Sequence, residues 1–133
     1  MLACSRLQTI ICTVRLGEAQ RFYEEVLGLP AKRKSHGGVI YDVGGGDLLV
    51  MPVPSLEPSA HTVVGFAVAD LGKVTDALVA RGLQWLRVPG LAHDEAGVVV
   101  TPWGARVVWF RDPDGNILSI VQYAEPGSQG MSP

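Results

Sequence analysis

The densest group of ionisable side chains in the sequence is the tripeptide His93-Asp94-Glu95. A histidine beside a carboxylate has the composition of a general base with an orienting group. Three adjacent residues point in different directions, however, and the flanking Pro89 and Gly97 are typical of a loop. We therefore expect the tripeptide to lie on a surface loop, with His93 kept as a candidate for proton transfer.

Two arginines and a serine are further polar candidates. Arg87 and Arg106 carry the charge needed to pair with an anionic ligand, although each also fits a surface ion pair or a side chain whose stem covers apolar surface. Ser119 has no evident base partner, which argues against a nucleophilic role. The run Gly44-Gly45-Gly46 opens no helix and therefore does not predict a phosphate site.

The first half of the chain is predicted to form a strand, a helix and further strands. Apolar spacing and β-branched residues predict a strand over 8–14, a helix over 18–27 ended by Gly28, and a hairpin of strands over 38–43 and 48–53. The glycines at 44–46 supply the positive φ angles of the hairpin turn.

The second half returns to the same order of elements. We expect a strand over 62–68, a helix from the N-cap Asp70 to Gly82, and strands over 84–88, 106–110 and 117–123, with a polar loop over 89–97 and a turn over 112–116. The offset of about 55 residues between the halves indicates a duplication. The predicted fold class is α+β, with two βαβββ repeats forming curved mixed sheets around a concave cavity and the helices outside.

Length and composition suit one domain. The chain has 133 residues, of which 47% are hydrophobic and 18% charged, enough apolar material for a single core. We expect one domain over 1–126, with halves over about 6–53 and 61–123, a proline-rich linker over 54–60, and a disordered tail over 127–133.

Charge and hydropathy exclude two classes of partner. The net charge is -2 and no basic run is longer than Lys32-Arg33-Lys34, which argues against nucleic acid. No apolar segment approaches the roughly 20 residues that cross a bilayer, so we expect no membrane partner. With no apolar leader at the start, we expect a cytoplasmic location.

Two segments carry a resemblance to a known family. Residues 22–29, FYEEVLGL, resemble the FY-x-x-x-LGL signature of the vicinal oxygen chelate superfamily, and residues 109–118, WFRDPDGNIL, resemble its F-x-DPDGN-x-(I/L) signature. Val63 to Leu71 is similar to the middle strand, so the resemblance covers roughly 6–123. The superfamily includes glyoxalase I, ring-cleaving dioxygenases, fosfomycin-resistance enzymes and bleomycin-resistance binding proteins.

The resemblance also implies four positions for the ligands of a divalent metal in the catalytic members. Gln8 stands at the first and is compatible with a metal, whereas the usual His falls at Val63 and the usual Glu at Ser119. The fourth belongs in the strand that contains Met51, which offers no ordinary ligand. His61 lies two residues from the expected His, too far along a strand for a metal bond to absorb. We therefore predict no metal and no other cofactor, and the pattern is most similar to metal-free bleomycin-resistance-like members.

Strand alternation predicts which residues would line a ligand cavity. If positions 8, 63 and 119 mark its face, side chains of the same parity join them. Trp103 lies in a segment that resembles the WG-x-R sequence of antibiotic-binding members, and Trp109 is a second aromatic candidate; either could instead fill the core or a dimer interface. The candidate ligand-binding residues are Gln8, Ile10, Cys12, Met51, Val63, Gly65, Trp103, Arg106, Trp109, Ser119 and Val121.

The leading hypothesis is a metal-free protein that sequesters a small, partly aromatic ligand in a cavity formed as a homodimer, because the members it resembles are dimers. Three alternatives remain open. The first is a metal-dependent lyase or dioxygenase whose ligands include Gln8 and His61. The second is a metal-free enzyme that uses Gln8, Tyr41 or His93 for proton transfer, and the third is a domain whose cavity has no present role.

Overall fold

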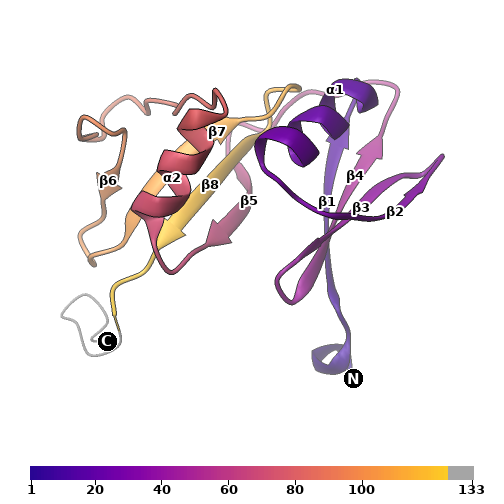
Figure 1. The fold of residues 1–133 in the computed structure, drawn as a ribbon, viewed down its shortest axis with the longest axis horizontal. Coiled ribbons are helices and arrows are strands. Elements are labelled where there is room, and N and C mark those ends of the chain that lie inside the picture. The colour runs from indigo at the N-terminus through magenta and orange to yellow at the C-terminus, as the bar shows by residue number, and fades with distance from the viewer. Residues whose placement is uncertain (126–133) are drawn as a thin grey trace. The chain divides into compact units, whose positions relative to one another are not determined.

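Two four-stranded sheets, each accompanied by one α-helix, form the computed structural model, which describes residues 1–125 (Figure 1). One unit comprises Met1–Ser59 with Asp112–Asn116, and the other comprises Ala60–Arg111 with the described residues 117–125. The predicted α+β class with two βαβββ-like halves is confirmed. The tail predicted to be disordered, 127–133, lies outside the described residues.

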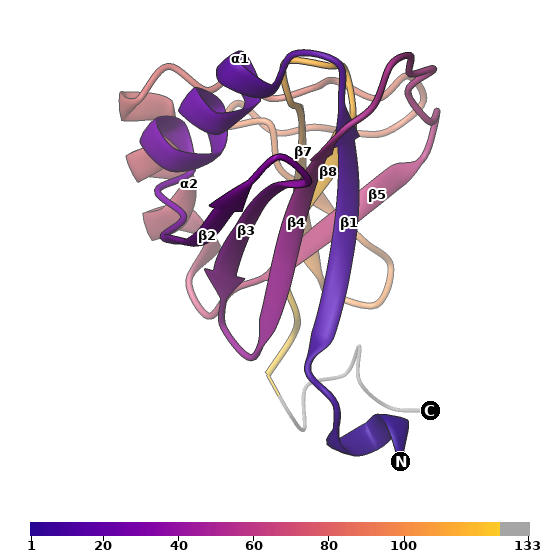
Figure 2. The same cartoon turned by 90° about the vertical axis from the view of Figure 1, so that its right-hand side faces the viewer.

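The first sheet has the strand order β1-β4-β3-β2. Its elements are a 3-10 turn at Leu2–Cys4, β1 (Leu7–Thr13), α1 (Leu16–Arg21), a π-helical turn at Phe22–Val26, β2 (Ala31–Ser35), β3 (Gly38–Val43) and β4 (Gly46–Pro52). β1 pairs with β4 in parallel, and the two strands run side by side in Figure 2. The two-residue turn between β3 and β4 uses Gly44 at a φ of 54°, as the glycine run predicts.

The core of the first unit lies between one face of this sheet and the helical segment. Ile11, Val50 and Tyr41 face this core and are buried, together with Ala19 of α1 and Tyr23 of the π-helical turn. The alternate residues of the same strands therefore form the other, more open face of the sheet.

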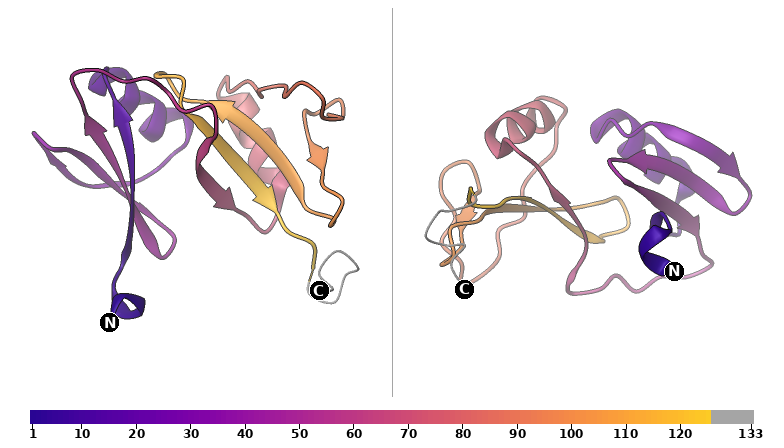
Figure 3. Two further views of the ribbon diagram at one scale, coloured as in Figure 1. Left: turned by 180° about the vertical axis from the view of Figure 1, so that it is seen from behind. Right: turned by 90° about the horizontal axis from the view of Figure 1, so that it is seen from below.

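The second sheet has the order β5-β8-β7-β6, with β5 (Thr62–Ala67), α2 (Leu71–Ala80), β6 (Val99–Val100), β7 (Arg106–Arg111) and β8 (Ile117–Gln122). α2 begins as predicted, because the side chain of Asp70 accepts a hydrogen bond from the Lys73 amide at 3.1 Å. Leu71 of α2 and Leu118 and Ile120 of β8 are buried, and from behind, in Figure 3, β7 and β8 lie in front of α2.

One predicted strand is wrong, and two observed strands were not predicted. Residues 84–88 form no strand; the fourth strand of the second sheet is β6, which pairs with β7. Trp85 and Leu86 are partly buried, which gives the segment the apolar character of a strand. The Leu86 amide donates to the Trp109 carbonyl of β7, but this pairing does not extend into a strand. β2 has no predicted counterpart, because its five residues are all exposed and polar or small.

The turn at Asp112–Asn116 belongs to the first unit although it connects two strands of the second sheet. The Asp112 carboxylate accepts hydrogen bonds from the amides of Asp114 and Asn116, from the Asn116 side-chain amide, and from the Tyr23 hydroxyl at 2.8 Å. Asp114 in turn accepts from the Thr13 hydroxyl and the Val14 amide. The two segments that carry the family resemblance are therefore joined by one polar network.

Among the residues described, no helix has the length and apolar character needed to cross a membrane.

Candidate functional site

The open face of the first sheet carries four of the predicted ligand-binding residues. Gln8, Ile10 and Cys12 alternate with the buried side of β1, and Met51 lies opposite Cys12 in the register of β4. Ile10 is 51% exposed and Gln8 is exposed. The predicted alternation therefore places all four side chains on the face away from the helical segment.

The open face of the second sheet carries most of the others. Gly65, Ser119 and Trp109 form one row across β5, β8 and β7, and Val121 follows two residues after Ser119. Val63 lies in an irregularity of β5 between Thr62 and Val64 and is 39% exposed. The face predicted from sequence parity is thus assembled on this sheet.

Two predicted residues are separated from that face. Arg106 pairs with Gln122 and has the parity of the buried Val108 and Phe110, so it lies on the side of the sheet that α2 covers. Trp103 lies in the turn that precedes β7 and is 56% exposed.

The residues at the family's metal positions do not fit a chelated divalent ion. Among the described residues, no three His, Cys, Asp or Glu side chains are grouped to hold a metal. Asp47, next to Gln8 in register, accepts from Arg6 Nε at 2.6 Å and lies 3.0 Å from Lys32 Nζ. The hydrogen bond from Arg6, followed by that from Lys32, lowers the pKa of Asp47. Because two cations already bind this carboxylate, Gln8 has too few neighbouring ligands to hold a metal that takes three or more protein groups.

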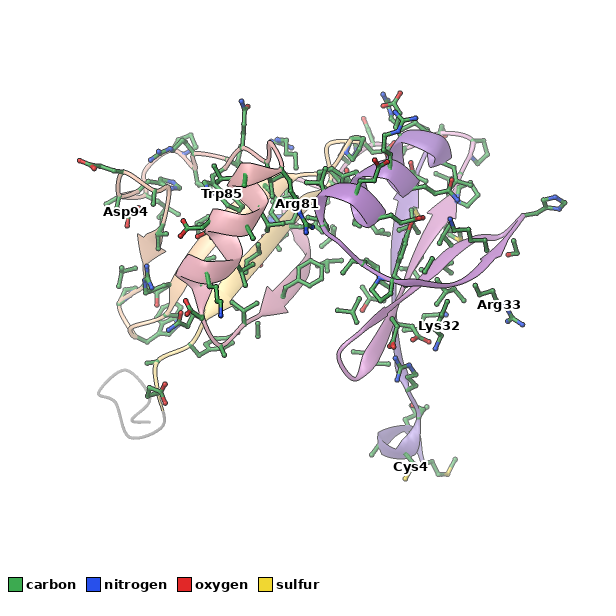
Figure 4. All side chains as sticks on the ribbon, in the orientation of Figure 1. Cys4, Lys32, Arg33, Arg81, Trp85 and Asp94 are labelled. Carbon is green, nitrogen blue, oxygen red and sulfur yellow. The ribbon has the colours of Figure 1, made fainter. Side chains whose placement is uncertain are left out.

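Figure 4 shows that Lys32 and Arg33 are on the β2 edge and Cys4 is in the turn before β1. Arg6, just before β1, also pairs with Asp42 of β3, so opposite charges lie next to one another at this end of the first sheet. All four groups of this cluster, Arg6, Lys32, Asp42 and Asp47, find partners within it. We interpret the cluster as an ion-pair network that closes the polar end of the open face.

Tyr41, a candidate for proton transfer, lies on the other face of the first sheet. Its side chain is fully buried, and its hydroxyl donates to Glu24 Oε2 at 2.9 Å. Burial and then this hydrogen bond raise the pKa of Tyr41 far above the usual tyrosine range. A phenol held protonated in the core is poorly suited to exchange protons with a ligand.

A cavity of about 370 Å³ opens on the second sheet, and we call it the Trp109 cavity. Its floor includes Trp109 and Arg111 of β7 and Ile117 of β8, and one wall is the segment Leu86–Pro89. This volume lies within the range of small-molecule sites, which combine apolar surface with a few polar groups.

Two backbone amides hold the wall of the Trp109 cavity in place. The Leu86 amide donates to the Trp109 carbonyl at 2.7 Å, and the Val88 amide donates to His93 Nε2 at 2.9 Å. Because an amide can only donate, Nε2 must be the unprotonated nitrogen, and Nδ1 donates to the Gly97 carbonyl at 2.9 Å.

His93 therefore acts as a positioning residue. Both of its ring nitrogens are engaged within the loop, and its ring contacts that of Trp109 edge to face with centroids 6.2 Å apart. Asp94 accepts from the Val98 amide instead of orienting the histidine. The tripeptide lies on a loop, as predicted, and Asp94 is labelled there in Figure 4.

The polar groups of the Trp109 cavity are cationic or neutral. Arg87, Arg111 and His61 line it, and the described residues around it include no aspartate or glutamate. Arg87 donates to the carbonyl oxygen of Asp94 at 3.0 Å, which is a neutral acceptor. The site can therefore attract negative charge beside an aromatic ring.

Sequence reasoning considered Arg87 and His61 but did not identify Arg111. The signal was present, because Arg111 directly follows the predicted strand 106–110 and has the parity of Trp109; in the structure it is the last residue of β7. The contribution of the wall could not be read from periodicity, since it depends on the hydrogen bonds of His93.

Comparison with known proteins places this geometry in a family. Residues 6–120 match the family described as the Glyoxalase/Bleomycin resistance protein/Dioxygenase superfamily. No curated protein matches the chain.

Solved structures with this fold are similar to the chain at low sequence identity. A glyoxalase/bleomycin resistance protein/dioxygenase from Nocardioides has a TM-score of 0.70 and 21% identity, with 97% of this chain and 89% of that chain covered. The counterpart from Alicyclobacillus acidocaldarius has a TM-score of 0.70, 18% identity, and 97% coverage of both chains. Lactoylglutathione lyase from Agrobacterium tumefaciens has a TM-score of 0.67 and 19% identity, with 90% and 95% covered. At these identities the likeness establishes the fold.

Proposed function

The chain belongs to the glyoxalase/bleomycin resistance protein/dioxygenase superfamily, and on that premise we propose that it is a metal-free protein that binds a small, partly aromatic molecule. The observation that carries the proposal is the Trp109 cavity, which combines an indole ring with aliphatic walls on the open face of the second sheet. Planar ligands gain from stacking on an indole, and the surrounding apolar surface adds to their burial.

The metal-free character rests on the donor set. Val63 and Ser119 occupy positions where the resemblance implies His and Glu, and Asp47 is held by Arg6 and Lys32. Binding would then depend on shape, stacking and hydrogen bonds.

Metal analysis and ligand titration test the proposal together. Purified protein is incubated with excess zinc, nickel, manganese or iron(II), desalted and analysed; we expect no stoichiometric metal. Planar aromatic compounds are then screened by tryptophan fluorescence and calorimetry. We expect Trp109→Phe to weaken binding, whereas Trp103→Phe, a change of the same kind on an exposed turn, leaves the affinity unchanged.

The alternative function is a metal-dependent lyase or dioxygenase. It is favoured by Gln8 on the open face of the first sheet and by the structural likeness to a protein named lactoylglutathione lyase. This alternative requires about one equivalent of metal per chain after desalting, and loss of that metal in Gln8→Ala. Such a result would overturn the metal-free proposal.

We also propose that the protein functions as a homodimer. β1 and β5 are edge strands of their sheets, and Leu7 at the start of β1 is 74% exposed. Unpaired strand edges and exposed apolar side chains are surfaces that a second copy can cover. Light scattering after gel filtration should give twice the mass of one chain, and a monomer at the concentrations used for binding would contradict the proposal.

A further inference from the structure

We propose that the Trp109 cavity selects small aromatic carboxylates, with Arg111 and Arg87 as the residues that bind the anion. This inference rests on the proposed function and specifies the chemical class of its ligand. The observation behind it is the juxtaposition of two guanidinium groups and one indole ring around a single cavity of about 370 Å³.

The position of Arg111 gives the first step of the argument. Arg111 ends β7, two residues after Trp109, so both side chains have the same parity on the open face. Ile117, opposite Arg111 in register, adds apolar surface to the floor. A flat ligand on the indole can therefore carry its charged group toward the end of the strand.

Arg87 approaches the same cavity from the wall. One guanidinium nitrogen, Nη1, donates to the Asp94 carbonyl at 3.0 Å, which holds the side chain against the loop. The guanidinium has five N–H donors in a planar arrangement, so this bond leaves donors available for a carboxylate. His61, which directly precedes β5, adds a further polar group to the lining.

The backbone donors of the wall favour a carboxylate over a phosphate. Phosphate sites commonly use several backbone amides that point at the ligand. Here the Leu86 amide is bonded to the Trp109 carbonyl and the Val88 amide to His93 Nε2. The arginine side chains are then the principal donors, and two parallel N–H bonds from a guanidinium match the two oxygens of a carboxylate.

The absence of acidic groups completes the argument. Among the described residues that line the cavity, none is aspartate or glutamate, although the whole chain has more acidic than basic residues. The local charge thus differs in sign from the net charge of -2. Such a site attracts anions and discriminates against cations.

The test compares naphthoate with naphthamide, which has the same ring without the charge, and with phenyl phosphate. Calorimetry on the full chain should show naphthoate bound at least about tenfold more tightly than the amide, with an affinity that falls as salt is raised. Phenyl phosphate should bind more weakly than naphthoate. Tighter binding of phenyl phosphate would overturn the choice of carboxylate.

Arg111→Gln provides the residue-level test, and Arg106→Gln provides a matched control on the opposite face of the same strand. We expect Arg111→Gln to weaken naphthoate binding by about tenfold or more while the affinity for the amide is retained. Arg106→Gln should leave both affinities unchanged. If Arg111→Gln proves unstable, anion selection is tested with Arg87→Gln and with the comparison of naphthoate and naphthamide on the unaltered protein.

The outcomes separate this inference from the proposed function. Equal binding of naphthoate and naphthamide, or an equal loss of both in Arg111→Gln, overturns the selection of anions and leaves an aromatic-binding protein. Failure of every aromatic probe, charged or neutral, overturns both.

Discussion

The Tyr23 hydroxyl donates a hydrogen bond of 2.8 Å to Asp112 Oδ2, and both residues are buried. The two residues come from the two segments that resemble family signatures, and both residues belong to the first unit. Asp112 accepts four hydrogen bonds in all, two at each oxygen. Such a buried carboxylate depends on its donors, since it has lost its water.

Tyr23→Phe should therefore destabilise the protein by about 1.5–3 kcal/mol, the range for hydrogen bonds to charged groups. The substitution removes one donor to Asp112 and leaves the ring in place. Tyr123→Phe is the control, because Tyr123 is 58% exposed and should change stability by less than about 0.5 kcal/mol. Urea unfolding with an unchanged m value measures both. Equal effects of the two variants would show that the Asp112 bond is not stabilising.

A second prediction concerns alkaline pH. Burial, followed by the charge of Asp112, raises the pKa of Tyr23, and burial, followed by the hydrogen bond to Glu24, raises that of Tyr41. The folded state therefore holds these two protons more tightly than the unfolded state, where tyrosine has a pKa of about 10. Their contribution to stability is fully present below about pH 10 and is lost as the pH rises above it.

Thermal unfolding followed across the alkaline range checks this sign. We expect the midpoint to fall above about pH 10, and the phenolate absorbance of Tyr23 and Tyr41 to rise together with unfolding. The double variant Tyr23→Phe/Tyr41→Phe should start less stable and show a smaller alkaline decline. If the midpoint of the double variant falls by the same amount, groups other than these two tyrosines cause the loss of stability at alkaline pH.

The comparison of sequence and structure shows which features local patterns determine. β1, β5, β8 and α2 were predictable because burial on one face imposes a regular alternation or a helical spacing. β2 was not, since its residues 31–35 are exposed and held by pairing with β3. Residues 84–88 show the converse, because Trp85 is packed against Phe110 without entering a strand.

The residues of the candidate site likewise include some that local patterns predicted and others that they did not. Alternation predicted the shared face of Gly65, Ser119 and Val121, because parity follows from a strand alone. Trp109, predicted only as an aromatic candidate, lies in the same row as Gly65 and Ser119. Alternation also puts Arg106 and Trp109 on opposite faces of the predicted strand 106–110, because they are three residues apart, so Arg106 did not belong with Trp109 among the lining residues. Alternation could not position Arg87 in the wall, because that position depends on contacts with residues elsewhere in the loop.

The loop behind this wall gives a third prediction. Gly97 and Gly90 have nearly the same positive φ, 88° and 87°. A Cβ atom at Gly97 would come within 3.0 Å of Trp85 Cδ1, whereas one at Gly90 would meet nothing within 4 Å. Both alanine variants should lose about 1–2 kcal/mol from left-handed strain. Gly97→Ala should lose about 1–3 kcal/mol more by displacing Trp85.

Chemical unfolding of the two variants isolates this contact because the strain is common to both. Trp85 also provides a local readout, since a displaced ring should change the near-ultraviolet circular dichroism in Gly97→Ala and not in Gly90→Ala. Matching stabilities and spectra would show that the loop yields to the extra methyl group without moving Trp85.

The last prediction concerns His93, whose two ring nitrogens join Val88 to Gly97 across the loop. His93→Ala leaves the Val88 amide without its acceptor and should cost about 1–3 kcal/mol. The wall of the Trp109 cavity should then be less ordered, so amide hydrogen exchange at Val88 should accelerate and the affinity for naphthoate should fall. His36→Ala, in the exposed turn between β2 and β3, is the matched control and should change neither quantity. Nitrogen chemical shifts of the imidazole provide a direct check, because the geometry requires the neutral form with the proton on Nδ1. A proton on Nε2 is incompatible with the bond from Val88 and would remove His93 from its positioning role.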